Sequence, residues 1–464
     1  MTPVSASITP AESALLRAVG RVAARYSVYP PSATFAPGHA ADAQAAFGAP
    51  RETADEPLAL YIHLPFCHAA CAFCRCHKIV TGDGGKAVRY LDYLAREIAA
   101  HARSLGERRA VSRMCWGGGT PTYYTASQLR RIWGVLKQHF TFAADGDYAI
   151  EIDPRTVDEA VLAELREMGY THAAVTVPDL DAAVLAAVAR PQSAEQSLEA
   201  IRAATRAGFG TVAVDVMYGL PHQSPHTLVA TLDAIVAAKP DRIVLHEYIH
   251  APRRHKGQRQ IAARDVPRGA ERLAMLSGAA DRLSTGGYVH LAADCFARAG
   301  DPLVAAQAGG RLCYDMTGYG TAGATNVLGI GVSAIGATRD TYTQNETDLG
   351  AYYDRINAGG LAIARGITLA PDDLVRREVI RLLLCRGRVA YADVEARCSV
   401  VFGRYFAAEL KALAPYAEAG LVRLGSAAIE VEPRGRLWLR NLCAVFDRYR
   451  GARGEGHVRA GSLP

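Results

Sequence analysis

Short apolar, β-branched runs alternate along this chain with longer stretches in which apolar residues recur at helical spacing. Within residues 127–140, for example, Leu129, Ile132, Leu136 and Phe140 fall on one face of a helix. Strands that alternate with helices of this length predict βαβ units around a parallel sheet. The predicted strands are 58–63, 111–116, 148–152, 173–177, 211–216 and 242–248, and the predicted helices are 88–104, 127–140, 157–168, 194–207 and 225–238.

Six such units are too few to close an eightfold barrel. The fold class is therefore expected to be α/β, with a partial, open parallel β/α barrel of six units. In parallel barrels the chemistry lies at the carboxyl ends of the strands. Polar and glycine-rich segments that directly follow the predicted strands are thus the first candidates for a site.

The regions on either side of the repeat differ from it in character. A helix over 11–24 precedes a proline-rich extended segment, whereas the part after the barrel is glycine-rich and then strongly helical. Late helices over 371–386, 391–397, 402–418 and 435–449, with strands over 421–424 and 429–432, resemble a winged-helix module. The predicted division is an N-terminal extension (1–57), the barrel core (58–250), a region that closes the barrel and faces substrate (251–364), a winged-helix-like lid (365–450) and a flexible tail (451–464).

Composition narrows the class of protein. Half of the 464 residues are apolar and 21% are charged, as in ordinary globular proteins. No apolar run approaches the ~20 residues of a membrane span, and no export signal is visible. Ten cysteines without such a signal indicate a reducing cytoplasm. The net charge of +6 is mild, and no basic run interleaved with aromatic residues indicates nucleic-acid binding.

Three cysteines form the strongest chemical signal. Cys67, Cys71 and Cys74 are spaced C-x3-C-x2-C, and Cys76 follows two residues later. Thiolates hold iron–sulfur clusters, and a cubane normally takes four of them. Three ligands leave one iron open for S-adenosylmethionine, which then accepts an electron and yields a 5′-deoxyadenosyl radical. Zinc would need a second cysteine pair, which is absent, and a disulfide is disfavoured without secretion.

Several polar or flexible residues follow the predicted strands. A run of three glycines and a threonine comes after the second strand, where a ligand could approach the backbone or where a tight turn would suffice. A carboxylate at a strand end either accepts from a cofactor or caps the next helix. The candidates are Gly118, Gly119, Thr120, Glu151, Arg190 and Asp215.

The cysteine segment resembles a known family. The run Leu60-Tyr-Ile-His-Leu-Pro-Phe-Cys67, the additional Cys76 and the following His77-Lys-Ile-Val-Thr81 are similar to oxygen-independent coproporphyrinogen III oxidases of the radical S-adenosylmethionine superfamily. The resemblance extends from about residue 25 to about residue 449. It implies one [4Fe-4S] cluster held by Cys67, Cys71 and Cys74, with Cys76 outside the ligand set.

The resemblance also assigns cofactor contacts residue by residue. Gly118, Gly119 and Thr120 match the segment that binds the amino group of S-adenosylmethionine, and Glu151 matches a residue that contacts the same molecule. Ile335 matches a residue that packs on its adenine. Arg190 and Asp215 match residues that bind a second S-adenosylmethionine. Tyr61 and Phe73 are matched cofactor contacts as well, and Ile249 occupies a cofactor position that is a small alanine in the family.

Departures from the family gather around the second cofactor and the substrate. Pro178 stands where the family has a glutamine that binds the second S-adenosylmethionine, and proline has neither an amide side chain nor a backbone N–H. Ile249 adds bulk in the same pocket. Cys295 and Thr317 replace a histidine and a glutamine in segments expected to face substrate.

The resemblance implies oxidative decarboxylation of two propionates of coproporphyrinogen III to vinyl groups, giving protoporphyrinogen IX in haem biosynthesis. It implies a monomer that receives electrons from a donor such as flavodoxin or ferredoxin. One alternative is a related radical methyltransferase or cyclopropanase with another substrate, motivated by the departures. A second alternative is a haem-binding chaperone, although such relatives generally lack the N-terminal extension and the Cys-x-Cys pair found here.

Overall fold

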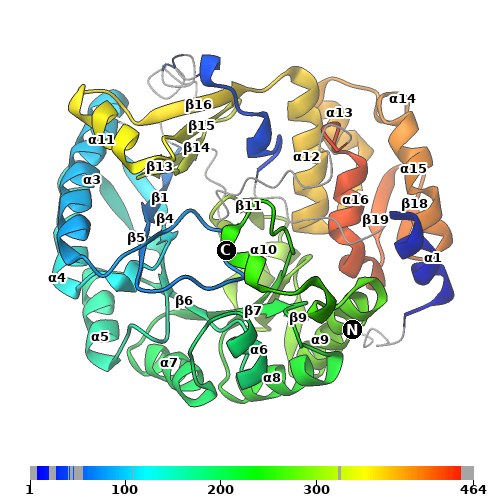
Figure 1. Cartoon of the computed structure of the whole chain (residues 1–464). Coiled ribbons are helices and arrows are strands. Elements are labelled where there is room, and N and C mark those ends of the chain that lie inside the picture. Colours follow the sequence, from blue (N-terminus) through cyan, green and yellow to red (C-terminus); the bar gives the residue numbers. More distant parts are fainter. Residues whose placement is uncertain are drawn as a thin grey trace.

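The molecule is built around one curved twelve-stranded sheet with helices on its outer side (Figure 1). The computed structural model describes residues 8–19, 28–39, 41, 45, 56–107, 109–321 and 326–450. The strand order in the large sheet is β16-β15-β14-β13-β1-β4-β5-β6-β7-β8-β10-β9. Among the described residues, no helix is both long and apolar enough to span a membrane.

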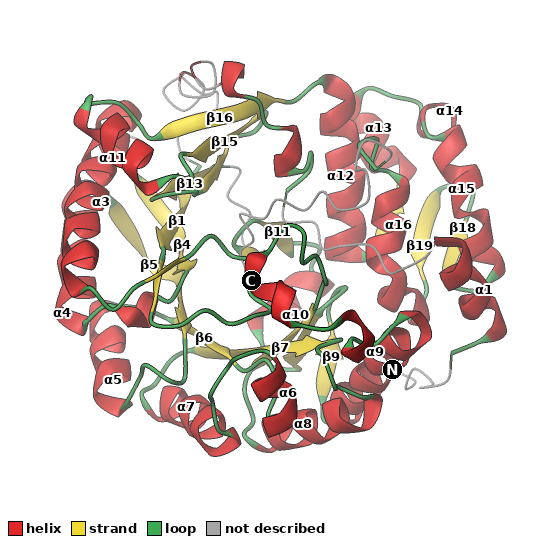
Figure 2. Cartoon of the chain, in the orientation of Figure 1, coloured by secondary structure: helices red, strands yellow, loops and turns green. Residues whose placement is uncertain are grey.

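The predicted open barrel is confirmed, with a parallel wall of seven neighbouring strands. Its strands are β13 (Val327–Ile330), β1 (Leu58–Leu64), β4 (Ala110–Gly118), β5 (Thr141–Ile152), β6 (His172–Thr176), β7 (Thr211–Tyr218) and β8 (Arg242–Glu247). Figure 2 shows the helices that cover the outer face of this wall. They are α3 (Gly84–Leu105), α4 (Ala126–His139), α5 (Glu159–Met168), α6 (Ala182–Ala187), α7 (Ala194–Arg206), α8 (Pro225–Ala237) and α9 (Gly269–Thr285).

Alternation along each strand separates core from lumen. In β7, Val212, Val214 and Val216 are fully buried under the helices, whereas Asp215 and Met217 are partly exposed on the opposite, lumen side. The covering helices follow the same logic. In α4 a Thr125–Gln128 capping box starts the helix, and Leu129, Ile132 and Leu136 form its buried face. The period-3.6 and period-2 patterns therefore predicted these elements correctly.

The sheet extends beyond the six predicted units. β13 pairs in parallel with β1, placing Tyr61 beside Gly329. Antiparallel strands then widen both edges of the sheet. They are β14 (Ile335–Ala337), β15 (Thr341–Asn345) and β16 (Ile363–Thr368) on one edge, and β10 (Cys295–Arg298) and β9 (Tyr288–His290) on the other. Short helices α10 (Pro302–Ala308) and α11 (Leu349–Asn357) connect these parts.

A small hairpin, β11 (Cys313–Asp315) and β12 (Gly318–Gly320), lies inside the curve of the sheet (Figure 1). The buried guanidinium of Arg113, on β4, holds it there. This group donates to Asp315 at 2.8 Å and to the carbonyl of Tyr319 at 3.3 Å. The hairpin thus reaches the lumen at the level of the middle of β4.

The C-terminal region is helical with a three-stranded sheet. Its elements are α12 (Pro371–Arg386), β17 (Arg388–Ala390), α13 (Tyr391–Cys398), α14 (Phe402–Tyr405), α15 (Ala407–Glu418), β18 (Val422–Leu424), β19 (Ala428–Val431) and α16 (Leu439–Val445). The single helix predicted over 402–418 is wrong, because the chain leaves helical geometry at Phe406 (φ −107°, ψ 27°). The last helix is also shorter than predicted, and β17 was missed.

Near the N-terminus, α1 (Pro10–Val19) packs against this region: the carboxylate of Glu12, fully buried, pairs with Arg434 at 2.8 Å. The expected continuation of this helix to residue 24 lies outside the described residues, as does the predicted flexible tail.

Candidate active site

A cavity of about 180 Å³ lies where β4, β5, β6, β7 and β8 end. All three motif cysteines open into it, together with Cys76. Among the other residues predicted to contact a cofactor, Phe73, Gly118, Gly119, Thr120, Glu151, Arg190 and Asp215 line the same cavity. The carboxyl ends of the strands therefore bring together segments that lie as far apart in the chain as Cys67 and Glu247, as expected for a parallel barrel.

The cysteine segment is fastened to the barrel through its backbone. Thr81 donates its N–H to the carbonyl of Cys67 at 3.1 Å, and Ala72 donates to Val188 at 2.8 Å. The side-chain amide of Gln258 donates to the carbonyl of Phe73 at 3.3 Å. These contacts hold the loop in place without using any cysteine sulfur, so the thiols remain available as ligands.

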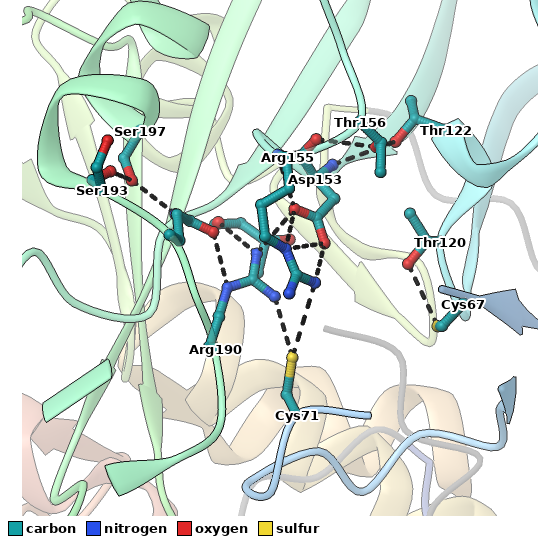
Figure 3. Close-up of polar contacts among 12 residues, drawn as sticks. Cys67, Cys71, Thr120, Thr122, Asp153, Arg155, Thr156, Arg190, Ser193 and Ser197 are labelled. Atoms are coloured by element: carbon teal, nitrogen blue, oxygen red, sulfur yellow. Dashed lines mark hydrogen bonds and ion pairs between the residues drawn. The ribbon is translucent and has the colours of Figure 1, made fainter. Parts of the chain in front are cut away.

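Two of the thiols have polar neighbours in the loops that follow β4, β5 and α6 (Figure 3). The Sγ of Cys67 lies 3.3 Å from the hydroxyl of Thr120. The Sγ of Cys71 accepts from Arg190 at 3.3 Å and from Arg155 at 3.9 Å. Cationic and hydroxyl donors of this kind stabilise thiolates, which are the ligand form of cysteine.

The fourth cysteine behaves as a partner of the third. The hydrogen bond between the two side chains lowers the pKa of Cys74, and the same contact raises the pKa of Cys76 well above its ordinary value. Cys74 is thus the better thiolate of the two. The exclusion of Cys76 from the ligand set stays a prediction, and this difference favours Cys74 as the ligand of the two.

The glycine segment passes tightly against the cysteine segment. Gly119 donates its N–H to the carbonyl of Leu64 at 2.8 Å, and Thr120 donates to Phe66 at 3.0 Å. A Cβ on Gly119 would lie 2.4 Å from the backbone of Pro65. Gly118 adopts φ +110°, a conformation that favours glycine. Gly119 is therefore required by the close approach of two backbones, and Gly118 by its conformation and by the neighbouring ring of His63.

Glu151 is the most perturbed carboxyl group in the cavity. Its Oε2 accepts from the N–H of Gly118 at 3.3 Å, but its buried Oε1 has no hydrogen-bond partner among the described residues. Burial, followed by the negative charge of Asp215, raises the pKa of Glu151 to about 8. A buried acceptor without a donor is costly, which indicates that a donor belongs here when a ligand is bound.

Arg190 is buried and donates several hydrogen bonds (Figure 3). It donates to Gln192 at 2.8 Å and to Asp153 at 3.2 Å, in addition to Cys71. Asp153 also pairs with Arg155 at 2.6 Å. The preceding residue, Ala189, has φ +53°, a left-handed conformation that asparagine tolerates better than alanine. The two arginines and Asp153 therefore form one charged group beside Cys71.

Asp215 has a partner that the sequence did not single out. Its Oδ1 lies 2.9 Å from Nε2 of His246, and both residues line the cavity. The signal was present in the alternation of β8, because Arg242, Val244 and His246 share one face and Ile243 and Leu245 are buried on the other. His246 lies near the carboxyl end of β8 on its lumen-facing side, so the sequence could have identified it as a candidate site residue.

The remaining predicted contacts lie outside the lining of this cavity. Tyr61 and Ile335 are buried together in an apolar cluster in the lumen. Ile249 follows the end of β8, and its carbonyl accepts from Gln258 at 3.1 Å. Pro178 is buried in the wall, where its carbonyl accepts from the N–H of Met217 at 3.0 Å.

The donor set suits a cluster better than a single ion. Within the ranges the structure describes, no three His, Cys, Asp or Glu side chains converge as the ligands of one metal ion. Three cysteines around one cavity, with donors to two of the sulfurs, match the thiolate ligands of a [4Fe-4S] cluster. The orphaned Oε1 of Glu151 is a suitable acceptor for an ammonium group placed beside that cluster.

Comparison with known proteins gives a consistent answer. Residues 61–235 match the model of the radical SAM superfamily. The chain is 40% identical to the oxygen-independent coproporphyrinogen III oxidase of Escherichia coli (strain K12), over 92% of both chains. It is 38% identical to the enzyme of the same name from Pseudomonas aeruginosa, over 92% of this chain and 93% of the other. The solved E. coli coproporphyrinogen III oxidase, described as a radical SAM enzyme, superposes with a TM-score of 0.88 at 38% identity, covering 94% of this chain and 98% of the other.

Proposed function

Because the chain belongs to the oxygen-independent coproporphyrinogen III oxidases, a family of radical SAM enzymes, we propose that it decarboxylates two propionates of coproporphyrinogen III to vinyl groups. The product is protoporphyrinogen IX, so the reaction belongs to haem biosynthesis. The observation that carries the proposal is the meeting of Cys67, Cys71 and Cys74 with Glu151 in one cavity.

In this proposal the three cysteines hold the cluster. A bound [4Fe-4S] cluster and S-adenosylmethionine together supply a radical that removes hydrogen from an unactivated carbon. Thr120 interacts with the sulfur of Cys67, and Arg190 and Arg155 donate to that of Cys71. These donors stabilise charge on the sulfurs, and the covering barrel keeps water away from the reaction. A small electron-transfer protein such as flavodoxin or ferredoxin would reduce the enzyme, and an oxidised one-electron carrier would take up the electron that each propionate loses together with CO2.

Gly118, Gly119 and Glu151 would bind the amino-acid end of S-adenosylmethionine. The absence of side chains on the two glycines lets the ligand approach the backbone. The free Oε1 of Glu151 would accept from the ammonium group. Tyr61 and Ile335, in the neighbouring apolar cluster, would form the wall on the lumen side.

Affinity for S-adenosylmethionine is expected to rise with pH. Since the pKa of Glu151 in the ligand-free protein is about 8, the carboxyl is mostly neutral at lower pH. A bound cation favours the ionised form, so binding must first release a proton. Calorimetric titration of the reconstituted protein between about pH 6.5 and 8.5 should show affinity increasing toward pH 8 and levelling above it.

Glu151→Gln is expected to remove this pH dependence and to weaken binding by about tenfold or more, because the charge-assisted hydrogen bond is lost. Glu164→Gln, on an exposed pair with Arg130, serves as the matched control. A Glu151→Gln protein that kept the pH dependence would assign it to another group.

A second S-adenosylmethionine is proposed to lie against Arg190 and Asp215. Both residues line the cavity, and Asp215 is oriented by His246. Pro178 offers no donor and its carbonyl is already used, so the second molecule would be held by fewer contacts than in relatives with glutamine there. Pro178→Gln is expected to tighten the second binding event in a two-site titration, and to leave the first unchanged. Equal binding isotherms for both proteins would contradict this assignment.

The reaction itself is tested with anaerobically reconstituted protein, dithionite, S-adenosylmethionine and coproporphyrinogen III. We expect loss of two CO2 units per substrate, measured by mass after oxidation to the porphyrin, with a matching amount of 5′-deoxyadenosine. The altered segments at Pro178, Cys295 and Thr317 favour one other outcome, a radical enzyme for a different substrate. Deoxyadenosine without decarboxylation would support that alternative and overturn the proposal.

A further inference from the structure

A second, larger cavity lies between the barrel and the C-terminal region. Its volume is about 860 Å³, within the ~300–1,000 Å³ of small-molecule sites, whereas the cavity at the cysteines measures about 180 Å³. Its walls are one face of α12, the β11–β12 hairpin and the start of β13. No residue lines both cavities among those described. The smaller cavity has no room for a tetrapyrrole in addition to a cofactor.

The larger cavity carries an excess of positive charge. Five arginines line it, against two carboxylates, Asp315 and Glu378. Asp315 is already paired with Arg113 at 2.8 Å. Glu378 is shared by Arg381 at 2.7 Å and Arg397 at 3.1 Å.

Arg339 and Arg377 remain without a carboxylate partner among the described residues. Arg377 donates to the backbone carbonyl of Arg339 and lies with its guanidinium 5.9 Å from the ring centre of Tyr342. These contacts orient the Arg377 side chain but leave its charge uncompensated. Guanidinium groups bind carboxylates through paired hydrogen bonds, so the uncompensated charge selects an anionic ligand.

The rest of the lining is apolar and suits a flat hydrophobic ring system. Met316, Val327, Ala337 and Tyr342 line the cavity and also belong to the apolar cluster that contains Tyr61. Tyr61 pairs with Cys115 of β4, two residues before Gly117, and the carboxylate of Glu151 lies against Gly117. One continuous apolar cluster therefore extends from the arginine-lined cavity toward Glu151.

We infer that this cavity binds the tetrapyrrole substrate, with Arg339 and Arg377 holding propionates that do not react in that turnover. The inference rests on the proposed function and specifies where its substrate lies. A macrocycle seated against Met316 and Tyr342 directs its remaining propionates past Tyr61 toward the cofactor. Four carboxylates on one apolar ring match the charge and the surface of this cavity.

The test is direct binding of coproporphyrin III, the stable oxidised form of the substrate, to full-length protein, followed by fluorescence. Mesoporphyrin IX, which has two carboxylates, is the comparison ligand. The wild type should bind coproporphyrin III about tenfold or more tightly than mesoporphyrin IX. In the double variant Arg339→Gln, Arg377→Gln, the affinity for coproporphyrin III should fall by about tenfold to a hundredfold. The preference for coproporphyrin III over mesoporphyrin IX should become smaller.

Arg388→Gln is the matched control, since Arg388 is an exposed arginine just beyond α12 that pairs with Glu430 at 3.1 Å and does not line the cavity. Thermal unfolding measurements show whether each variant is folded. Arg381→Gln is a second, independent variant, because Arg381 also lines the cavity. Wild-type affinity in both the double variant and Arg381→Gln would overturn the inference.

The same proteins separate this inference from the proposed function. If the wild type decarboxylates coproporphyrinogen III while the double variant keeps its KM, the function stands and the location is wrong. If the wild type binds coproporphyrin III through the arginines but does not decarboxylate coproporphyrinogen III, the location stands and the function is wrong. A raised KM, with 5′-deoxyadenosine formation without substrate unchanged, supports both.

Discussion

Replacing Cys67, Cys71 or Cys74 with serine is expected to abolish cluster assembly and activity, whereas Cys76→Ser retains the cluster iron. All four thiols open into one cavity, but Cys74 is the favoured thiolate of the last pair, because the hydrogen bond from Cys76 lowers its pKa. A serine hydroxyl ionises too weakly to replace a thiolate ligand. Each of the three ligand variants should therefore lose the cluster, and with it the activity, completely.

Iron and sulfide content after anaerobic reconstitution, with the visible absorption of the cluster, measures the effect before any activity assay. Cys295→Ser is a suitable further control, because Cys295 is buried on β10, away from this cavity. Loss of iron from Cys76→Ser as severe as from Cys74→Ser would make Cys76 a ligand and change the proposed donor set.

Gly119→Ala is expected to destabilise the protein by about 3 kcal/mol and to abolish binding of S-adenosylmethionine. The new Cβ would lie 2.4 Å from the backbone carbonyl group of Pro65 and 2.8 Å from the carbonyl oxygen of Leu64. Both neighbours are backbone atoms, so no side chain can rotate away. The two segments must separate, which breaks the 2.8 Å hydrogen bond from Gly119 to Leu64.

Gly134→Ala provides the opposite result from the same chemical change. Gly134 lies inside α4, where a Cβ would meet no atom within 4 Å. Alanine in a helix interior is favoured over glycine by about 0.5–1 kcal/mol, so this variant should be more stable and fully active. Denaturant unfolding of the two variants beside the wild type measures both effects. Wild-type stability of Gly119→Ala would contradict the close approach.

Local patterns predicted the barrel well because its helices and strands each bury one face. The six strands and five helices expected from 58 to 248 are all present, with ends shifted by a few residues at most places. β5 begins earlier, at Thr141, because residues at its start face outward and carry little apolar signal. The pairing of β13 with β1 was not predictable in this way, because a parallel partner can lie anywhere in the chain.

The site was predictable where chemistry and position in a strand coincide. Glu151 and Asp215 were found at strand ends, and the structure places both in the cavity with the cysteines. The roles of Tyr61, Ile335 and Ile249 came from resemblance alone, and these residues do not line that cavity. The contact of Arg190 with Cys71 depends on how α6 and the following turn are placed, which no local pattern specifies.

The position of β1 between β4 and β13 also bears on how the protein is made. Ile62 pairs with Ile330, a residue that leaves the ribosome long after the cysteine segment has been synthesised. Until then one edge of β1 presents unpaired backbone groups, and contacts across such a separation form slowly. Nascent chains that end before β13 are therefore exposed to aggregation through this edge.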